Sequence, residues 1–153
     1  MKNKSVVKQQ ILDSCKQVIS DRISVIENNL EAVRESRNNE TKSSAGDKYE
    51  TSRAMLQIEE DNYQKQLHQA MLLKNQLEQI NVTSQSVQAD QGSLVVTNQG
   101  SYFISIGLGK ITLENGSYFC ISSGSPMGQK LTNQQVGFKF SFNGQHFEIM
   151  EVQ

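Results

Sequence analysis

Two long segments that lack glycine and proline constrain the fold of this chain most. They run from about residue 5 to 37 and from about residue 48 to 80. Apolar side chains in the first segment recur at alternating steps of four and three positions, which forms the narrow heptad seam of a coiled coil. The seam residues of the first segment are Ile19, Ile23, Ile26, Leu30 and Val33. The second segment carries a similar series at Leu56, Tyr63, Leu67, Ala70, Leu73, Leu77 and Ile80.

The two seams match each other when the chain folds back near Ser43. Facing residues then have numbers that add to about 86, and most apolar positions face apolar partners. These pairs are Leu30 with Leu56, Ile23 with Tyr63, Ile19 with Leu67 and Val6 with Ile80. We therefore predict that residues 1–80 form an antiparallel coiled-coil hairpin with its tip at about residues 38–48. At about 1.5 Å per residue the hairpin is about 50 Å long.

After a polar linker at residues 81–92, the pattern changes to β-structure. Short runs rich in β-branched and aromatic residues follow, separated by Asn, Gln and Gly. These runs are 93–97, 101–106, 110–113, 117–121, 137–142 and 145–152. Asn143 and Gly144, between the last two runs, are typical of a two-residue type I′ hairpin turn. The sequence thus predicts an α+β fold, with a small β-rich C-terminal domain at residues 93–153.

A short helix is expected inside the β-rich region. Ser125 has the residue type of an N-cap, and Pro126 fits the first helical position, where a missing N–H costs nothing. We expect this helix to run to Leu131.

A polar stretch at residues 43–50 lies where the first helical pattern ends and the second begins. Gly46 permits a sharp turn of the backbone. Asp47 and Glu50 are three positions apart at the start of the second helix, so both carboxylates lean to one side of its first turn. Such acids cap a helix and interact with its dipole, or they serve a function at the tip. The spacing alone leaves both interpretations open.

Charge and cysteine content set limits on partners and compartment. The formal net charge is −1, so bulk electrostatics favours neither nucleic acid nor a membrane as partner. No apolar run has the length of a membrane span or the form of a signal peptide. Cys15 and Cys120 lie in different kinds of segment, and we expect free thiols in a reducing, cytoplasmic setting. Two histidines and two scattered cysteines do not indicate a structural zinc site.

Two motifs, in this order of parts, resemble the Gre transcript-cleavage factors of bacterial RNA polymerase. The tip motif of that family, Gly-Asp-x-x-Glu, is matched by Gly46-Asp47-Lys48-Tyr49-Glu50. The C-terminal motif is matched by Ser125-Pro126-Met127, then Leu131 at the end of the short helix and Gly137 before the last hairpin. The chain departs from the family at Thr51-Ser52-Arg53 after the tip. It departs again at Asn133-Gln134 after the short helix, where Asn can still adopt the left-handed conformation.

The resemblance implies a fold and a mode of action. The C-terminal domain at 93–153 would be FKBP-like and would bind the polymerase, with Ser125, Pro126 and Met127 as candidate contacts. The coiled coil would enter the secondary channel, where Asp47 and Glu50 act on backtracked RNA at the polymerase active centre and Gly46 shapes the turn. The two acids would share Mg²⁺ with the polymerase, and no cofactor would be tightly bound. The protein would be a monomeric, cytoplasmic accessory factor, while the polymerase performs the catalysis.

Three other functions remain open. A relative with this fold could bind the polymerase and inhibit or regulate it without cleavage, because the tip differs after Glu50. The chain could instead be a coiled-coil interaction protein unrelated to polymerase. A prolyl isomerase is the third alternative, because domains of the Gre C-terminal type are related to FKBP.

Overall fold

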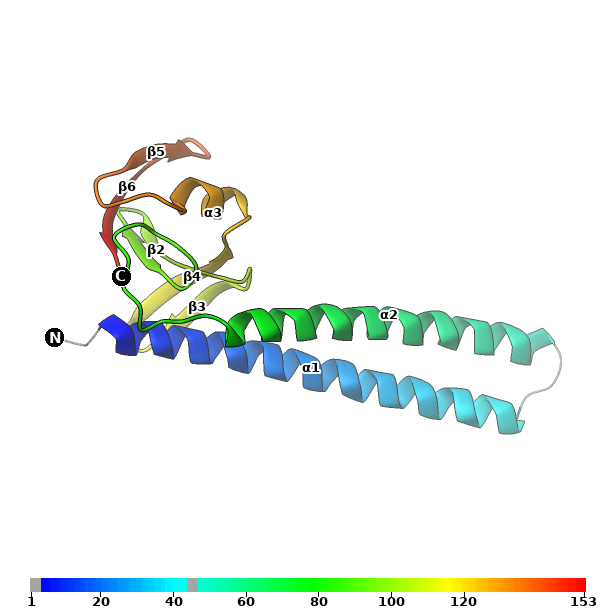
Figure 1. Cartoon of the computed structure of the whole chain (residues 1–153). Helices are drawn as coiled ribbons and strands as arrows, with labels where there is room; N and C mark the ends of the chain where they lie inside the picture. Colours follow the sequence, from blue (N-terminus) through cyan, green and yellow to red (C-terminus); the bar gives the residue numbers. More distant parts are fainter. Residues whose placement is uncertain (1–3, 44–46) are drawn as a thin grey trace. The chain divides into compact units, whose positions relative to one another are not determined.

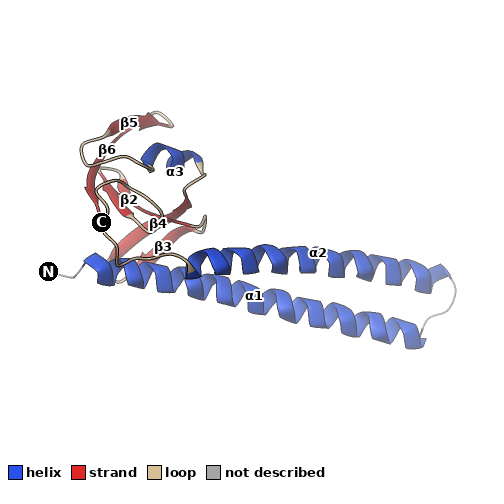
Figure 2. Cartoon of the chain, in the orientation of Figure 1, coloured by secondary structure: helices blue, strands red, loops and turns tan. Residues whose placement is uncertain are grey.

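The computed structural model describes residues 4–43 and 47–153, with the side chains of residues 40–43 and 47–49 excepted. Two long helices come first and a six-stranded sheet follows, so the predicted α+β fold is confirmed (Figures 1 and 2). The helices are α1 (Lys4–Ser43), α2 (Asp47–Glu78) and α3 (Pro126–Leu131). The strands are β1 (Leu94–Thr97), β2 (Gly100–Ser105), β3 (Gly109–Leu113), β4 (Gly116–Ser122), β5 (Lys139–Phe142) and β6 (Gln145–Val152).

The chain forms two compact units. The hairpin unit is Val18–Lys74, and the sheet unit combines Met1–Gln17 with Asn75–Gln153. Helix α1 therefore contributes its first part to the sheet unit and its remainder to the hairpin unit.

In the hairpin unit, α1 and α2 run antiparallel and pack through their apolar seams (Figure 1). Ile26, Leu30 and Ala70 are buried together at the centre of this contact, and Ile23, Tyr63 and Leu67 pack around them. Most residues outside the narrow seam are polar and exposed, as the heptad pattern predicts. The hairpin also carries large apolar side chains that are exposed, which are Val18, Val25, Met55, Ile58, Met71 and Leu72.

The predicted register of the hairpin is wrong by about one heptad. Arg34 bonds to Glu60 and Arg37 bonds to Gln57, and the numbers of each pair add to 94 rather than about 86. A heptad seam offers nearly equivalent apolar matches at every slip of about seven residues, so apolar pairing alone does not select between them. The polar contacts to α2, together with the start of that helix at Asp47, distinguish the observed register.

The sheet has the strand order β3-β4-β2-β1-β6-β5. Neighbouring strands pair antiparallel except β2 and β4, which are parallel because β3 returns the chain along the outer side of β4. Strand β6 lies between β1 and β5, so the last strand of the chain is an internal strand of the sheet.

The predicted turn chemistry of the sheet unit is confirmed. Asn143 and Gly144 both have positive φ, 50° and 77°, as a type I′ hairpin requires. Asn133, after α3, also has a left-handed backbone with φ of 69°. Asn tolerates this conformation better than most residues, so the chain turns there without a glycine.

Helix α3 begins with the predicted cap. The Ser125 hydroxyl accepts a hydrogen bond from the N–H of Gly128 at 3.1 Å and donates one to the Ser122 carbonyl at 2.7 Å. Gly128 approaches the end of β4 so closely that a Cβ there would lie 2.0 Å from the Ser122 carbonyl oxygen. Only glycine fits this position without a shift of the backbone.

Alternation along the strands gives the sheet two buried faces. One face packs against α3 and the last hairpin through a core of Ala89, Val95, Ile104, Met127, Leu131, Phe147 and Ile149. Segment 81–92 contributes to this core through Ala89, whose N–H donates to the Gln134 carbonyl at 2.9 Å. The other face carries Phe103 and its neighbour Cys120, which are both buried.

Candidate functional site at the turn end of the hairpin

The predicted tip motif spans the end of α1 and the start of α2. Gly46 lies outside the described residues. Asp47 is the first residue of α2, as the sequence predicts to within one position, but its side chain lies outside those described. Glu50 is exposed to solvent on the first turn of this helix. Positions 47 and 50 are therefore about one helical turn apart at the N-terminal end of a 32-residue helix.

This position gives a carboxylate two possible uses. The N-terminus of a long helix carries partial positive charge, which stabilises acids in its first turn. An exposed carboxylate at the end of a hairpin is also accessible to a partner. Carboxylate oxygens are the ligands that Mg²⁺ takes, usually one or two from a protein with water in the remaining positions. Glu50 fits that requirement by its exposure and its chemistry.

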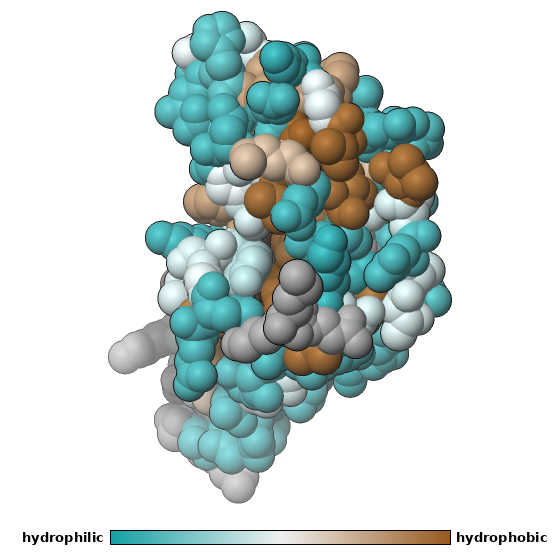
Figure 3. Space-filling model, turned by 90° about the vertical axis from the view of Figure 1, so that its left-hand side faces the viewer, coloured by the Kyte–Doolittle hydropathy of each residue, from teal (hydrophilic) through white to brown (hydrophobic). Residues whose placement is uncertain are grey.

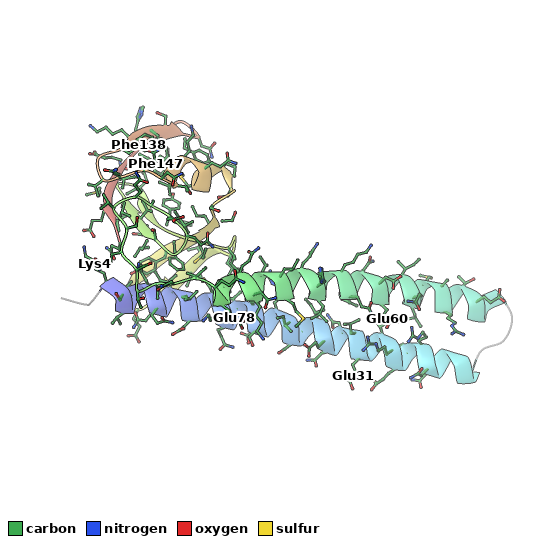
Figure 4. The ribbon with its side chains drawn as sticks, viewed as in Figure 1. Lys4, Glu31, Glu60, Glu78, Phe138 and Phe147 are labelled. Carbon is green, nitrogen blue, oxygen red and sulfur yellow. The ribbon has the colours of Figure 1, made fainter. Side chains whose placement is uncertain are left out.

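A polar cluster on the hairpin lies about ten residues from Glu50 along α2, a distance of about 15 Å. Figure 4 labels Glu60 on α2. The Glu60 carboxylate is buried, with 5% of the residue exposed, and it accepts hydrogen bonds from both Arg34 and Arg37 of α1. The Arg34 Nε to Glu60 Oε1 distance is 3.0 Å. Arg37 also donates to the Gln57 side chain at 3.1 Å. These contacts join the two helices near the turn and hold the register there.

The predicted partner contacts on α3 divide into two kinds. Pro126 is exposed and Ser125 is half-buried, so both are accessible at the start of the helix. Met127 is buried in the core of the sheet unit with 8% of its surface exposed. A partner at this end of α3 would meet Ser125 and Pro126, while Met127 supports them from within.

The aromatic residues of the last hairpin pack mainly against each other. Phe140 and Phe147 stack with ring centroids 5.1 Å apart, and Phe138 stacks on Phe140 at 5.7 Å. Phe138 and Phe147 lie close together in the sheet unit in Figure 4. These phenylalanines therefore belong to the core of the sheet unit. Their alternation along the strands predicts this role.

Some apolar side chains of the sheet unit remain exposed. Figure 3 shows hydrophobic residues that reach the surface on the face it presents, with hydrophilic residues around them. The large apolar residues of this unit that stand exposed within its C-terminal part are Val87, Phe119, Val136 and Met150.

The structure brings together two residues that the sequence reasoning kept apart. Cys15 of α1 and Cys120 of β4 are free thiols, as predicted, but their sulfurs are only 3.4 Å apart. Both lie in the sheet unit. The heptad position of Cys15 and the strand alternation around Cys120 marked each residue as buried, and nothing in either pattern indicated that they meet.

A buried lysine is a second feature that the sequence did not indicate. Lys8 is 2% exposed, and its Nζ donates to the Ser84 carbonyl at 3.3 Å. Burial lowers the pKa of Lys8 below its usual value. This contact attaches the loop after α2 to the first part of α1.

Among residues 4–43 and 47–153, no group of three or more His, Cys, Asp or Glu side chains is arranged to hold a metal ion. No helix in the same ranges has an apolar stretch long enough to cross a bilayer. No protein-family model matches the chain. No curated protein has significant sequence similarity to it.

Proposed function

We propose that this protein is a Gre-like transcription factor that binds bacterial RNA polymerase and stimulates cleavage of backtracked RNA. The observation that carries the proposal is the order of parts. An acidic motif begins the second helix of a long antiparallel hairpin, and a β-rich unit with a Ser-Pro helix follows. The match between this order and the motif residues, rather than either motif alone, supports the proposal.

In this proposal the hairpin delivers Asp47 and Glu50 to the polymerase active centre. The helical residues of the hairpin unit on either side of the turn extend about 40 Å at 1.5 Å per residue, which gives the acids their reach. The contacts of Glu60 with α1 keep the two helices aligned near the turn. Glu50 is exposed to solvent, so its carboxylate is accessible to a partner.

The acids fit a shared Mg²⁺ ion better than a site of their own. One or two carboxylates are too few to hold Mg²⁺ tightly, but they can add to carboxylates that the polymerase supplies. When bound there, the ion lowers the pKa of a water and stabilises the charge of the leaving oxygen. Asp47 and Glu50 contribute negative charge and orient water at the tip.

The sheet unit would provide the attachment. Ser125 and Pro126 are accessible at the start of α3, and Gly128 and Met127 fix that helix against the sheet. Exposed apolar side chains such as Met150 add surface suited to a protein partner. This unit would bind outside the channel while the hairpin enters it.

The test is a cleavage assay with a stalled complex of the polymerase from the same organism. We expect the wild-type protein to restore RNA cleavage and the double variant Asp47→Ala, Glu50→Ala to lose it. A matched control is Glu27→Ala with Glu31→Ala, which removes two exposed acids from α1 and changes the net charge equally. The control variant should keep full activity. If all three proteins give equal cleavage, the acids have no such role.

Two results would support other functions. Suppression of RNA synthesis without cleavage would favour a polymerase-binding inhibitor with the same fold. The departure from the family at Thr51-Ser52-Arg53 is the feature that favours this second candidate. Failure to recover any polymerase subunit in a pull-down with purified polymerase would favour an interaction protein of another kind.

A further inference from the structure

The only two cysteines of the chain touch each other. They are 105 positions apart in sequence, yet the sulfurs of Cys15 and Cys120 are 3.4 Å apart. A formed disulfide has a sulfur–sulfur distance of about 2.05 Å, so the two atoms need to approach by a little over 1 Å. A small rotation about either side-chain bond can supply such a movement.

Both thiols are buried, and a serine hydroxyl lies near them. Cys15 is fully buried on the inner side of α1, and Cys120 is 1% exposed on β4 beside Phe103. The Ser105 hydroxyl on β2 is buried and has no hydrogen-bond partner of normal geometry among the described residues. It lies close to both thiols.

The contact also shifts the pKa values of the two thiols in opposite directions. The hydrogen bond between the two thiols lowers the pKa of Cys15, whereas the contact with Cys15 and burial raise the pKa of Cys120. A thiolate formed at one sulfur would lie beside the other thiol, because the two sulfurs are in contact. A thiolate with a neighbouring thiol is the arrangement of a nucleophilic cysteine with its resolving partner.

Packing of two apolar side chains does not explain why the two sulfurs are in contact. Buried free cysteine often acts as a small apolar residue, and each of these two would do so separately. Apolar packing does not require that both meet at sulfur contact, or that a serine hydroxyl lies unsatisfied beside them. We propose that Cys15 and Cys120 are a redox modification site that forms an intramolecular disulfide in response to a peroxide.

The chemistry balances with hydrogen peroxide as the oxidant. The Cys15 thiolate attacks one peroxide oxygen, the O–O bond breaks, and the leaving hydroxide takes up a proton to give water and a sulfenic acid on Cys15. The Cys120 sulfur then attacks the sulfenic sulfur. Hydroxide leaves and takes the Cys120 proton, which gives a second water and the S–S bond. The two cysteines lose two electrons in total, and the peroxide gains them.

The bond would fix the first part of α1 to the sheet. Within the sheet unit, Met1–Gln17 belongs with a segment that begins only at Asn75. The contacts that join them near the helix start are otherwise non-covalent, such as Lys8 with Ser84. A disulfide between α1 and β4 would make this attachment permanent until a thiol reductant removes it. This redox chemistry is independent of the proposed role in transcription.

The experiment uses the reduced full-length protein exposed to hydrogen peroxide under native conditions, followed by denaturation, alkylation of free thiols and mass spectrometry. We expect a monomer that is lighter by about two hydrogen atoms and takes up no alkyl group, with Cys15 and Cys120 linked in one peptide pair. Dithiothreitol should restore both alkylation sites. Because both thiols are buried, local opening limits the reaction, and the time course should be slow.

Single-cysteine variants provide the controls. Cys15→Ser should leave Cys120 reduced for longer than the wild-type pair, because the sulfur that lies in contact with it is absent. Cys120→Ser should oxidise at Cys15 to sulfenic acid that a dimedone probe captures.

The proposal is overturned if wild-type protein retains two alkylatable thiols, or gains oxygen at one cysteine without a link. Disulfides only between copies of the chain would overturn it as well. These outcomes are measured on the wild-type protein, so they decide between a redox pair and two packing residues even where a variant fails to fold.

Discussion

The buried carboxylate of Glu60 gives the sharpest test of how the hairpin is held. Glu60→Gln keeps the size of the side chain and removes its charge. The arginine that bonds to the oxygen kept by the amide still makes a charge-assisted hydrogen bond, because its guanidinium group stays charged. By contrast, the amide NH₂ of glutamine is a donor and cannot accept from one of the guanidinium groups.

The expected loss of stability in Glu60→Gln depends on the hydrogen bonds lost and on the exposure of the two arginines. A hydrogen bond to a charged group contributes about 1.5–3 kcal/mol, so losing one of the two bonds costs about 2 kcal/mol. Arg34 has 51% of its side chain exposed and Arg37 only 27%, so water replaces the lost contact more readily at Arg34. Double-mutant cycles should therefore find a larger coupling of Glu60 with Arg37 than with Arg34.

The assay is hydrogen exchange of the backbone amides in Val18–Lys74. Because the chain has two compact units, an unfolding transition measured on the whole protein need not report the stability of the hairpin. We expect the exchange free energy of these amides to fall by about 2 kcal/mol in Glu60→Gln. The exposed neighbour Glu59→Gln is the matched control and should change it by less than about 0.5 kcal/mol. A loss below about 0.5 kcal/mol in Glu60→Gln is the value of an exposed ion pair and would refute the reasoning.

Three further predictions concern the sheet unit. Gly128→Ala should lower the free energy of unfolding of the sheet unit by about 2 kcal/mol in urea, because the new methyl would collide with the Ser122 carbonyl. Gly124→Ala is the control and should leave that free energy nearly unchanged, because nothing lies within 4 Å of the new methyl. Ser125→Ala should cost about 1 kcal/mol in the same assay through loss of the α3 cap. The lowered pKa of Lys8 means that the unfolded chain binds more protons below pH 10.5, so stability should rise with pH toward that value. Lys8→Met should abolish this rise in unfolding midpoints measured from about pH 8 to about pH 11, and an unchanged slope would contradict it.

Much of the fold follows from local signals in the sequence. The two helices were predictable because each lacks glycine and proline and repeats its apolar residues at coiled-coil spacing. The last hairpin was predictable from Asn143 and Gly144, whose positive φ values few other residue pairs accept. Each of these features depends on residues that are close together in sequence.

The register and the thiol contact were not predictable, for a common physical reason. Both depend on residues far apart in sequence, such as Arg37 with Glu60 and Cys15 with Cys120. A seven-residue slip conserves the apolar pairing of the hairpin, so the deciding interactions are polar contacts that periodicity does not describe. For the candidate site, the sequence placed Glu50 correctly on the first turn of α2, and the structure adds that its side chain is exposed.

The division of the chain makes the hairpin an insertion within another folding unit. Because Met1–Gln17 and Asn75–Gln153 belong together, the segment between them can change in length without altering the sheet unit. Removing seven residues from α1 and the facing seven from α2 would keep the seam in phase and shorten the hairpin by about 10 Å. Evolution could thus set the length of this segment in steps of one heptad. A protein built in this way can gain or lose length in its hairpin by deletion or duplication alone.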